Sequence, residues 1–161
     1  MSHPLIAKYQ TAALHVLNDK LGIQDAVAMS DTLIEFQYDQ FLVRMVFDEQ
    51  DPHFVRLIMP GLHTVEVDDK AGIQRLEHCI NDLNFQYKLA KLFRVDTLVD
   101  DRYNPASACI EFLALRTSDL EAARMSRYLD AMAHAARELH FDLKRKESAG
   151  AEATMHDGPV H

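Results

Sequence analysis

The sequence predicts an α+β fold in which three helices cover an antiparallel sheet of five strands. In three segments the apolar residues recur at steps of three and four, the spacing of amphipathic helices; these are residues 4–21, 70–83 and 118–143. Five others are predicted strands, and in the first two the apolar residues recur at every second position, as in half-buried strands; the five are residues 34–38, 41–47, 54–59, 87–95 and 109–115. The elements therefore follow the order α-β-β-β-α-β-β-α, a three-strand meander and then a two-strand hairpin.

The length and composition fit one folded domain. The chain has 161 residues, of which 48% are hydrophobic and 26% are charged, as in ordinary globular proteins. We assign residues 1–145 to this single domain. Residues 146–161 contain three Ala, two Gly and one Pro without an apolar period, so we expect this C-terminal tail to be disordered.

Turn-forming residues set the boundaries in the first half of the chain. Gly22 suits the C-terminal cap of the first helix. Residues 39–40 form a two-residue turn between the first two strands, and residues 48–52 separate the second strand from the third. The third strand is expected to end before Pro60-Gly61, after which a short extended piece over residues 62–67 leads to the second helix.

Similar signals set the boundaries in the second half. Asn84 lies where the second helix is expected to stop, and residues 100–105 are rich in turn formers. Ser118 and Glu121 match a capping box, in which both side chains satisfy free N–H groups at a helix start. The helix that follows carries a long apolar stripe that includes Leu129, so it must lie against a sheet or a partner.

Three stretches resemble a known fold. They are Lys-Leu-Gly at residues 20–22, Cys-Ile-Asn-Asp-Leu-Asn at residues 79–84 running into the strand at 87–95, and the hairpin that leads into the helix capped by Ser118. Over about residues 5 to 143 the chain resembles the YbjN-like family and the class I type III secretion chaperones, which share one fold. A Trp common near the Asn that ends the second helix of YbjN-like proteins is absent, and the chain contains no Trp. The resemblance implies protein binding and homodimers and carries over no catalytic residue.

The charge and the overall pattern exclude several classes of partner. Seventeen basic and twenty-five acidic residues give a net charge of −8, which argues against binding to nucleic acid or to an anionic membrane. No secretory signal and no apolar run of membrane-spanning length is visible. Only two cysteines occur, Cys79 and Cys109, far fewer than a disulfide framework needs. We therefore expect a cytoplasmic protein with free thiols.

No pattern predicts catalysis, a cofactor or a metal site. His134 and His140 are six positions apart and therefore lie on different faces of a helix. His78 and Cys79 are adjacent, so their side chains diverge, and Cys79 falls on an apolar stripe typical of a core thiol. The acidic clusters lack the spacing of a calcium loop, and no GxGxxG, Walker or GxSxG motif occurs. We expect a protein that is not an enzyme and holds no cofactor.

One face of the meander stands out as a candidate partner-binding or dimer surface. A two-residue turn at 39–40 places Glu35 opposite Arg44, and a five-residue connection places Arg44 opposite Ile58 and Arg56 opposite Val46. One face of the sheet is then fully apolar and should meet the helices. The other mixes arginines with apolar side chains, a composition that interfaces favour; its candidate residues are Leu33, Leu42, Arg44, Val46, Phe54, Arg56 and Ile58.

These observations predict a non-enzymatic protein-binding module that acts as a homodimer. It would be a secretion-chaperone-like escort for a client protein or a YbjN-like regulatory partner, and strand addition to an exposed sheet edge is a further binding mode. The mixed face is covered either by the second helix or a dimer mate, or by a client. Two other classes stay open: a small-ligand sensor with a pocket between sheet and helices, and an enzyme with an unfamiliar constellation.

Overall fold

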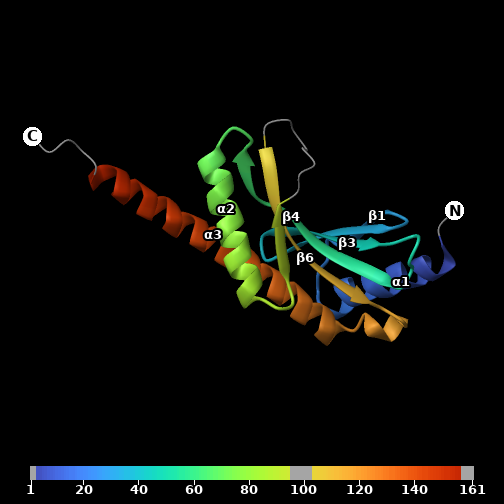
Figure 1. Ribbon diagram of the computed structural model, residues 1–161. Coiled ribbons are helices and arrows are strands. Elements are labelled where there is room, and N and C mark those ends of the chain that lie inside the picture. Colours follow the sequence, from blue (N-terminus) through green and yellow to red (C-terminus); the bar gives the residue numbers. More distant parts are fainter. Residues whose placement is uncertain (1–2, 95–102, 157–161) are drawn as a thin grey trace, which may run out of the picture.

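The computed structural model describes residues 3–94 and 103–156, which form one sheet with helices packed against it (Figure 1). The helices are α1 (Pro4–His15), α2 (Lys70–Gln86) and α3 (Ala122–His156), with a π-helical segment η1 (Val16–Lys20) after α1 and a 3-10 turn η2 (Thr117–Asp119) before α3. The strands are β1 (Val27–Ser30), β2 (Leu33–Tyr38), β3 (Phe41–Phe47), β4 (Phe54–Glu66), β5 (Lys91–Arg94) and β6 (Tyr103–Leu113).

The sheet is antiparallel, with the strand order β1-β2-β3-β4-β6-β5. The predicted α+β class and the order of three helices are confirmed. The expected five strands are six, because β1 pairs with β2 at the edge of the sheet. All four residues of β1 are exposed, so this strand has no buried side that would produce an alternating pattern in the sequence.

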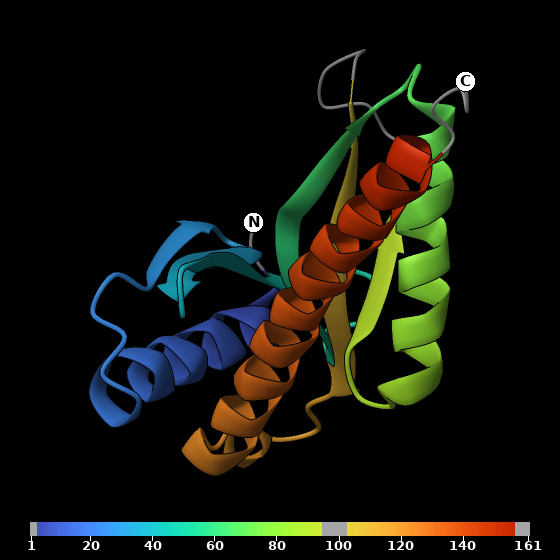
Figure 2. The same ribbon diagram turned by 90° about the vertical axis from the view of Figure 1, so that its left-hand side faces the viewer.

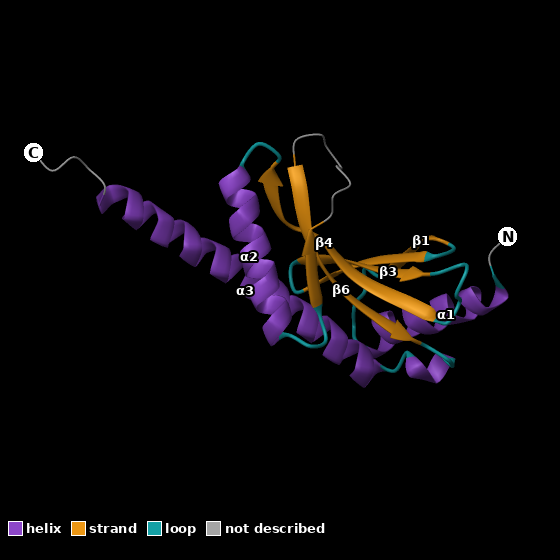
Figure 3. Ribbon diagram, viewed as in Figure 1, coloured by secondary structure: helices purple, strands orange, loops and turns teal. Residues whose placement is uncertain are grey.

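The helices lie on one face of the sheet and bury its apolar side. Figure 2 shows α1 and α3 crossing this face, with α2 beside α3, and Figure 3 shows the same separation of helices from strands. The predicted apolar face forms the core: its Phe41 is partly buried, and the other members are at most 2% exposed, namely Ile34, Phe36, Val43, Met45, Phe47, Val55, Leu57 and Met59. Leu129 of α3 and Leu76 of α2 are fully buried against them.

The register of the meander is as predicted. Asp39 and Gln40 both have positive φ, 47° and 72°, which is the backbone of a tight hairpin turn of the primed type. Glu35 therefore pairs with Arg44. Across the next connection Arg44 pairs with Ile58, and Val46 pairs with Arg56.

The third strand does not end at Pro60-Gly61 as expected. Gly61 has a φ of 63°, a conformation that favours glycine, and the pairing with β6 shifts between Met59 and His63 and then resumes. Residues 62–66, expected to be a separate extended piece, therefore belong to β4. Pro60-Gly61 therefore marks a bulge within β4 and not the end of a strand.

The hairpin strands also differ from their expected bounds. β5 begins at Lys91 and not at residue 87, and residue 95 lies outside the described part of the chain. β6 begins at Tyr103, so residues 103–105 of the expected turn are strand, while residues 100–102 are not described. Long pairing with β4 extends β6 beyond what the local turn formers suggest.

The expected capping box at Ser118 is wrong. The helix α3 begins at Ala122, and the 3-10 turn η2 precedes it. Asp119 provides the local acceptor, because its Oδ2 accepts hydrogen bonds from the backbone N–H groups of Leu115 and Arg116, at 2.8 Å and 2.9 Å. These bonds lower the pKa of the Asp119 carboxyl, because they favour its charged form.

The helix α3 continues through most of the segment that was expected to be disordered. It reaches His156, so residues 146–156 are helical, and residues 157–161 lie outside the described part of the chain. Residues 147–150 are exposed. The Ala, Glu and Lys residues of this segment have high helix propensity, which continues the helix without an apolar face.

Asn84 does not end the second helix but joins it to the sheet. The helix α2 continues to Gln86, and the Asn84 side chain forms two hydrogen bonds with the backbone of Leu92 in β5. Its Nδ2 donates to the Leu92 carbonyl and its Oδ1 accepts from the Leu92 N–H, each at 2.8 Å. The Asn84 amide thus forms with Leu92 the pair of hydrogen bonds that the backbone of a neighbouring strand would form.

Replacing Asn84 with Ala should lower the free energy of unfolding by about 1–3 kcal/mol, because the backbone N–H and C=O of the buried Leu92 lose their hydrogen-bond partner. Chemical denaturation measures the loss. Asn81→Ala, on an exposed position of the same helix, is the control and should cost less. Equal losses at the two positions would show that the Asn84 bridge does not stabilise the fold.

Candidate functional site: the open sheet face

The structure brings the predicted surface residues together on the face of the sheet that points away from the helices (Figure 2). Arg44 is exposed and the rest are half-buried, in contrast to the buried residues with which they alternate along the strands. All seven predicted residues lie on this face, which we call the open sheet face; they are Leu33, Leu42, Arg44, Val46, Phe54, Arg56 and Ile58.

The open sheet face is wider than the sequence suggested. The strand β6 pairs with β4 so that Leu113 lies opposite Phe54, Glu111 opposite Arg56 and Cys109 opposite Ile58. The alternation of Cys109, Glu111 and Leu113 with buried or half-buried neighbours is visible in the sequence. The sequence does not reveal that β6 lies next to β4, because that order depends on a long-range pairing. We include these three residues in the open sheet face.

Cross-strand ion pairs balance the charge of this face. The Nε of Arg44 lies 3.0 Å from Oε2 of Glu35, and the Nε of Arg56 lies 2.6 Å from Oε1 of Glu111. Both pairs are between directly opposite residues of neighbouring strands. Each arginine therefore has its charge matched on the same face, and exposed pairs of this kind contribute little to stability.

Apolar side chains surround the two ion pairs. Val46, Ile58 and Phe54 are half-buried, and Leu113 at the border of the face is 57% exposed. The guanidinium of Arg56 lies over the Phe54 ring, 5.9 Å from its centroid. An aromatic ring and aliphatic side chains beside arginines are what protein interfaces contain, so the chemistry of this face suits contact with another protein.

The two cysteines occupy opposite environments. Both are free; Cys79 is fully buried on the inner side of α2, and Cys109 is half-buried on the open sheet face. The prediction of unlinked thiols is confirmed for this structure. Burial, followed by the nearby Glu111 carboxylate, raises the pKa of the Cys109 thiol.

Because Cys109 is partly accessible, it should react with iodoacetamide in the native protein, whereas the fully buried Cys79 should react only after unfolding. Because the raised pKa reduces the thiolate fraction, the labelling rate should still increase with pH where an ordinary thiol has levelled off. Mass spectrometry of labelled peptides over a pH series measures both. Faster native labelling of Cys79 than of Cys109 would contradict the placement of these thiols.

The described residues contain neither a metal-binding cluster nor a membrane-spanning helix. In residues 3–94 and 103–156, no three His, Cys, Asp or Glu side chains are placed to hold a metal ion together. Within the same ranges, no helix is both long and apolar enough to cross a bilayer. Apolar side chains pack between the helices and the sheet, and a hollow of about 610 Å³ lies beside them, where Phe41 and Leu62 of the sheet face His140 of α3.

Comparison with known proteins shows the fold alone. No protein-family model matches the sequence, and no curated protein matches it. Among solved structures the chain is similar to the "Crystal structure of YbjN, a putative transcription regulator from E. coli", with a TM-score of 0.58 and 12% sequence identity. The match covers 79% of this chain and 88% of the YbjN chain. The expected YbjN-like fold is confirmed.

Proposed function

We propose that the protein is a non-enzymatic binding module that uses the open sheet face to contact another protein, in the first instance a second copy of itself. The observation that carries the proposal is that this face combines half-buried apolar side chains with arginines, while the described helices all lie on the other side of the sheet. A surface of this composition loses unfavourable contact with water when a partner covers it.

The charge distribution supports a second copy as the partner. Two chains that each carry a net charge of −8 repel one another over most of their surfaces. On the open sheet face Arg44 is matched by Glu35 and Arg56 by Glu111, so repulsion is weakest there. Two such faces can approach without placing an unpaired charge in the interface, which would be costly.

The YbjN-like fold fits a role in regulation. YbjN is described as "a putative transcription regulator", and we propose that this chain regulates through protein contact, because its acidic charge disfavours nucleic acid. We place the protein in the cytoplasm. A client-escort role like that of secretion chaperones would use the same face, with the client competing with the second copy.

The accessibility of Cys109 tests the proposal. If a second copy covers the open sheet face, the rate of iodoacetamide labelling at Cys109 should fall as the protein concentration rises. A control protein with Cys109→Ala and Ser148→Cys carries its reactive thiol on an exposed position of α3 and should label equally fast at every concentration. A Cys109 rate independent of concentration in a dimeric protein would place the interface elsewhere.

A further inference from the structure

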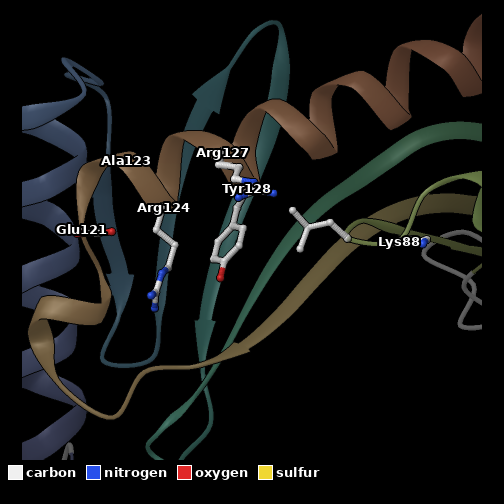
Figure 4. A pocket seen from close by; sticks show the side chains of 7 residues that line it. Lys88, Glu121, Ala123, Arg124, Arg127 and Tyr128 are labelled. Carbon is white, nitrogen blue, oxygen red and sulfur yellow. The ribbon is translucent and has the colours of Figure 1, made fainter.

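A hollow of about 700 Å³ lies between the start of α3 and the segment that leads into β5. Arg124 and Tyr128, one helical turn apart, project side by side from α3 into it, and Lys88 lies across from them (Figure 4). Leu89 and Ala123 form an apolar part of its lining. Tyr128 packs on Phe112, and their ring centroids are 4.9 Å apart. Because Phe112 and Glu111 are adjacent in β6, their side chains point to opposite sides of the sheet. The hollow is therefore separate from the open sheet face, to which Glu111 belongs.

The hollow concentrates positive charge in an acidic chain. Three cationic side chains line it, Lys88, Arg124 and Arg127, against one carboxylate, that of Glu121. Arg124 contacts Asp119 at long range, because its Nη1 donates a hydrogen bond to the Asp119 carbonyl at 3.5 Å and lies 3.8 Å from the Asp119 Oδ1. In the part of the chain that the structure describes, no ion pair or hydrogen bond engages the side chains of Lys88 and Arg127.

Lys88 and Arg127 therefore have all their N–H groups available for an incoming anion, and Arg124 has those that do not contact Asp119. Arginine presents several N–H groups in a plane, which suits two-point contact with phosphate or carboxylate oxygens. The Tyr128 hydroxyl forms no hydrogen bond within the described residues, and its ring together with Leu89 offers an apolar surface beside the cations. The lining thus has one cationic part and one apolar part.

We propose that this hollow binds a small molecule in which a phosphate or carboxylate group is attached to a ring or a short apolar chain. The anionic group would lie between Arg124, Arg127 and Lys88, and the apolar part against Tyr128 and Leu89. This site does not depend on the proposed protein contact, since none of its residues belongs to the open sheet face.

Phenyl phosphate is a suitable test compound because it contains both parts. Titration followed by amide chemical shifts should show saturable changes at residues 88–89 and 123–128, and the affinity should fall with added salt. Phenol, which lacks the anion, should produce no saturable change, and inorganic phosphate should bind more weakly than phenyl phosphate.

Charge-matched variants distinguish binding by the side chains of the hollow from attraction by the overall charge of the protein. Arg124→Gln with Arg127→Gln should weaken phenyl phosphate binding by about tenfold or more. Lys144→Gln with Arg145→Gln removes the same charge from exposed positions farther along α3 and should leave the affinity unchanged. Circular dichroism confirms folding, and Arg127→Gln alone, at an exposed position, should give a smaller loss. Equal losses in the two double variants, or no saturable binding to the native protein, would overturn the proposal.

Discussion

Replacing Leu129 with Ala is expected to lower the free energy of unfolding by about 2–5 kcal/mol, the largest loss of stability that we predict for a single side chain. Leu129 is fully buried and lies in the middle of the apolar stripe by which α3 meets the sheet. Truncation removes the transfer free energy of the lost carbons and leaves a cavity that close-packed neighbours fill only in part. Urea denaturation followed by circular dichroism measures the change.

An identical substitution on the surface provides the control. Leu115 is 64% exposed, so Leu115→Ala should change the free energy of unfolding by less than about 0.5 kcal/mol. If Leu129→Ala costs no more than Leu115→Ala, the stripe of α3 does not form the core in the way that the structure shows.

Replacing both Arg44 and Arg56 with Glu is expected to weaken self-association by more than about tenfold while leaving the fold intact. Each new carboxylate would face an existing one, Glu35 or Glu111, so a neutral face would become strongly acidic. Two such faces would repel one another. The fold should tolerate the change because both arginines are on the face that no described helix covers.

The matched control changes two arginines away from the open sheet face. Arg137 pairs with Asp39 and Arg145 with Asp142, so replacing both with Glu makes the same charge change and also breaks two surface ion pairs. Analytical ultracentrifugation of both double variants gives the comparison. The open sheet face would lose its proposed role if only the control dissociated, or if both variants assembled like the native protein.

Local pattern was sufficient to predict the meander and its two faces. A two-residue turn leaves only one register for β2 and β3, and the strict alternation of side chains then assigns every residue to a face. The seven predicted residues of the open sheet face follow from that register. Their pairing across β3 and β4 also depended only on the five-residue length of the connection, residues 49–53, which places Asp48 opposite Phe54.

Features that depend on distant pairing or on weak patterns were not predictable in this way. The place of β6 beside β4 adds Glu111 and Leu113 to the open sheet face, and no local signal specifies that neighbour. The exposed strand β1 has no buried side to reveal it. Helix propensity continues α3 past Lys146, where the lack of an apolar period suggested disorder.

The hollow beside α3 illustrates the same limit for a site. Arg124 and Tyr128 are spaced by four, which places them on one face of a helix. Lys88 comes from a segment distant in the sequence, and only the packing of that segment near the start of α3 brings the cations together. A sequence pattern limited to one element cannot show such a convergence.

The molar mass of the native protein in solution tests the central claim most directly. Light scattering after gel filtration should give about twice the chain mass of 18.4 kDa at micromolar concentration, because the open sheet face of one copy covers that of another. A mass of 18.4 kDa across the whole concentration range would contradict the account, since the open sheet face would then remain uncovered by a second copy.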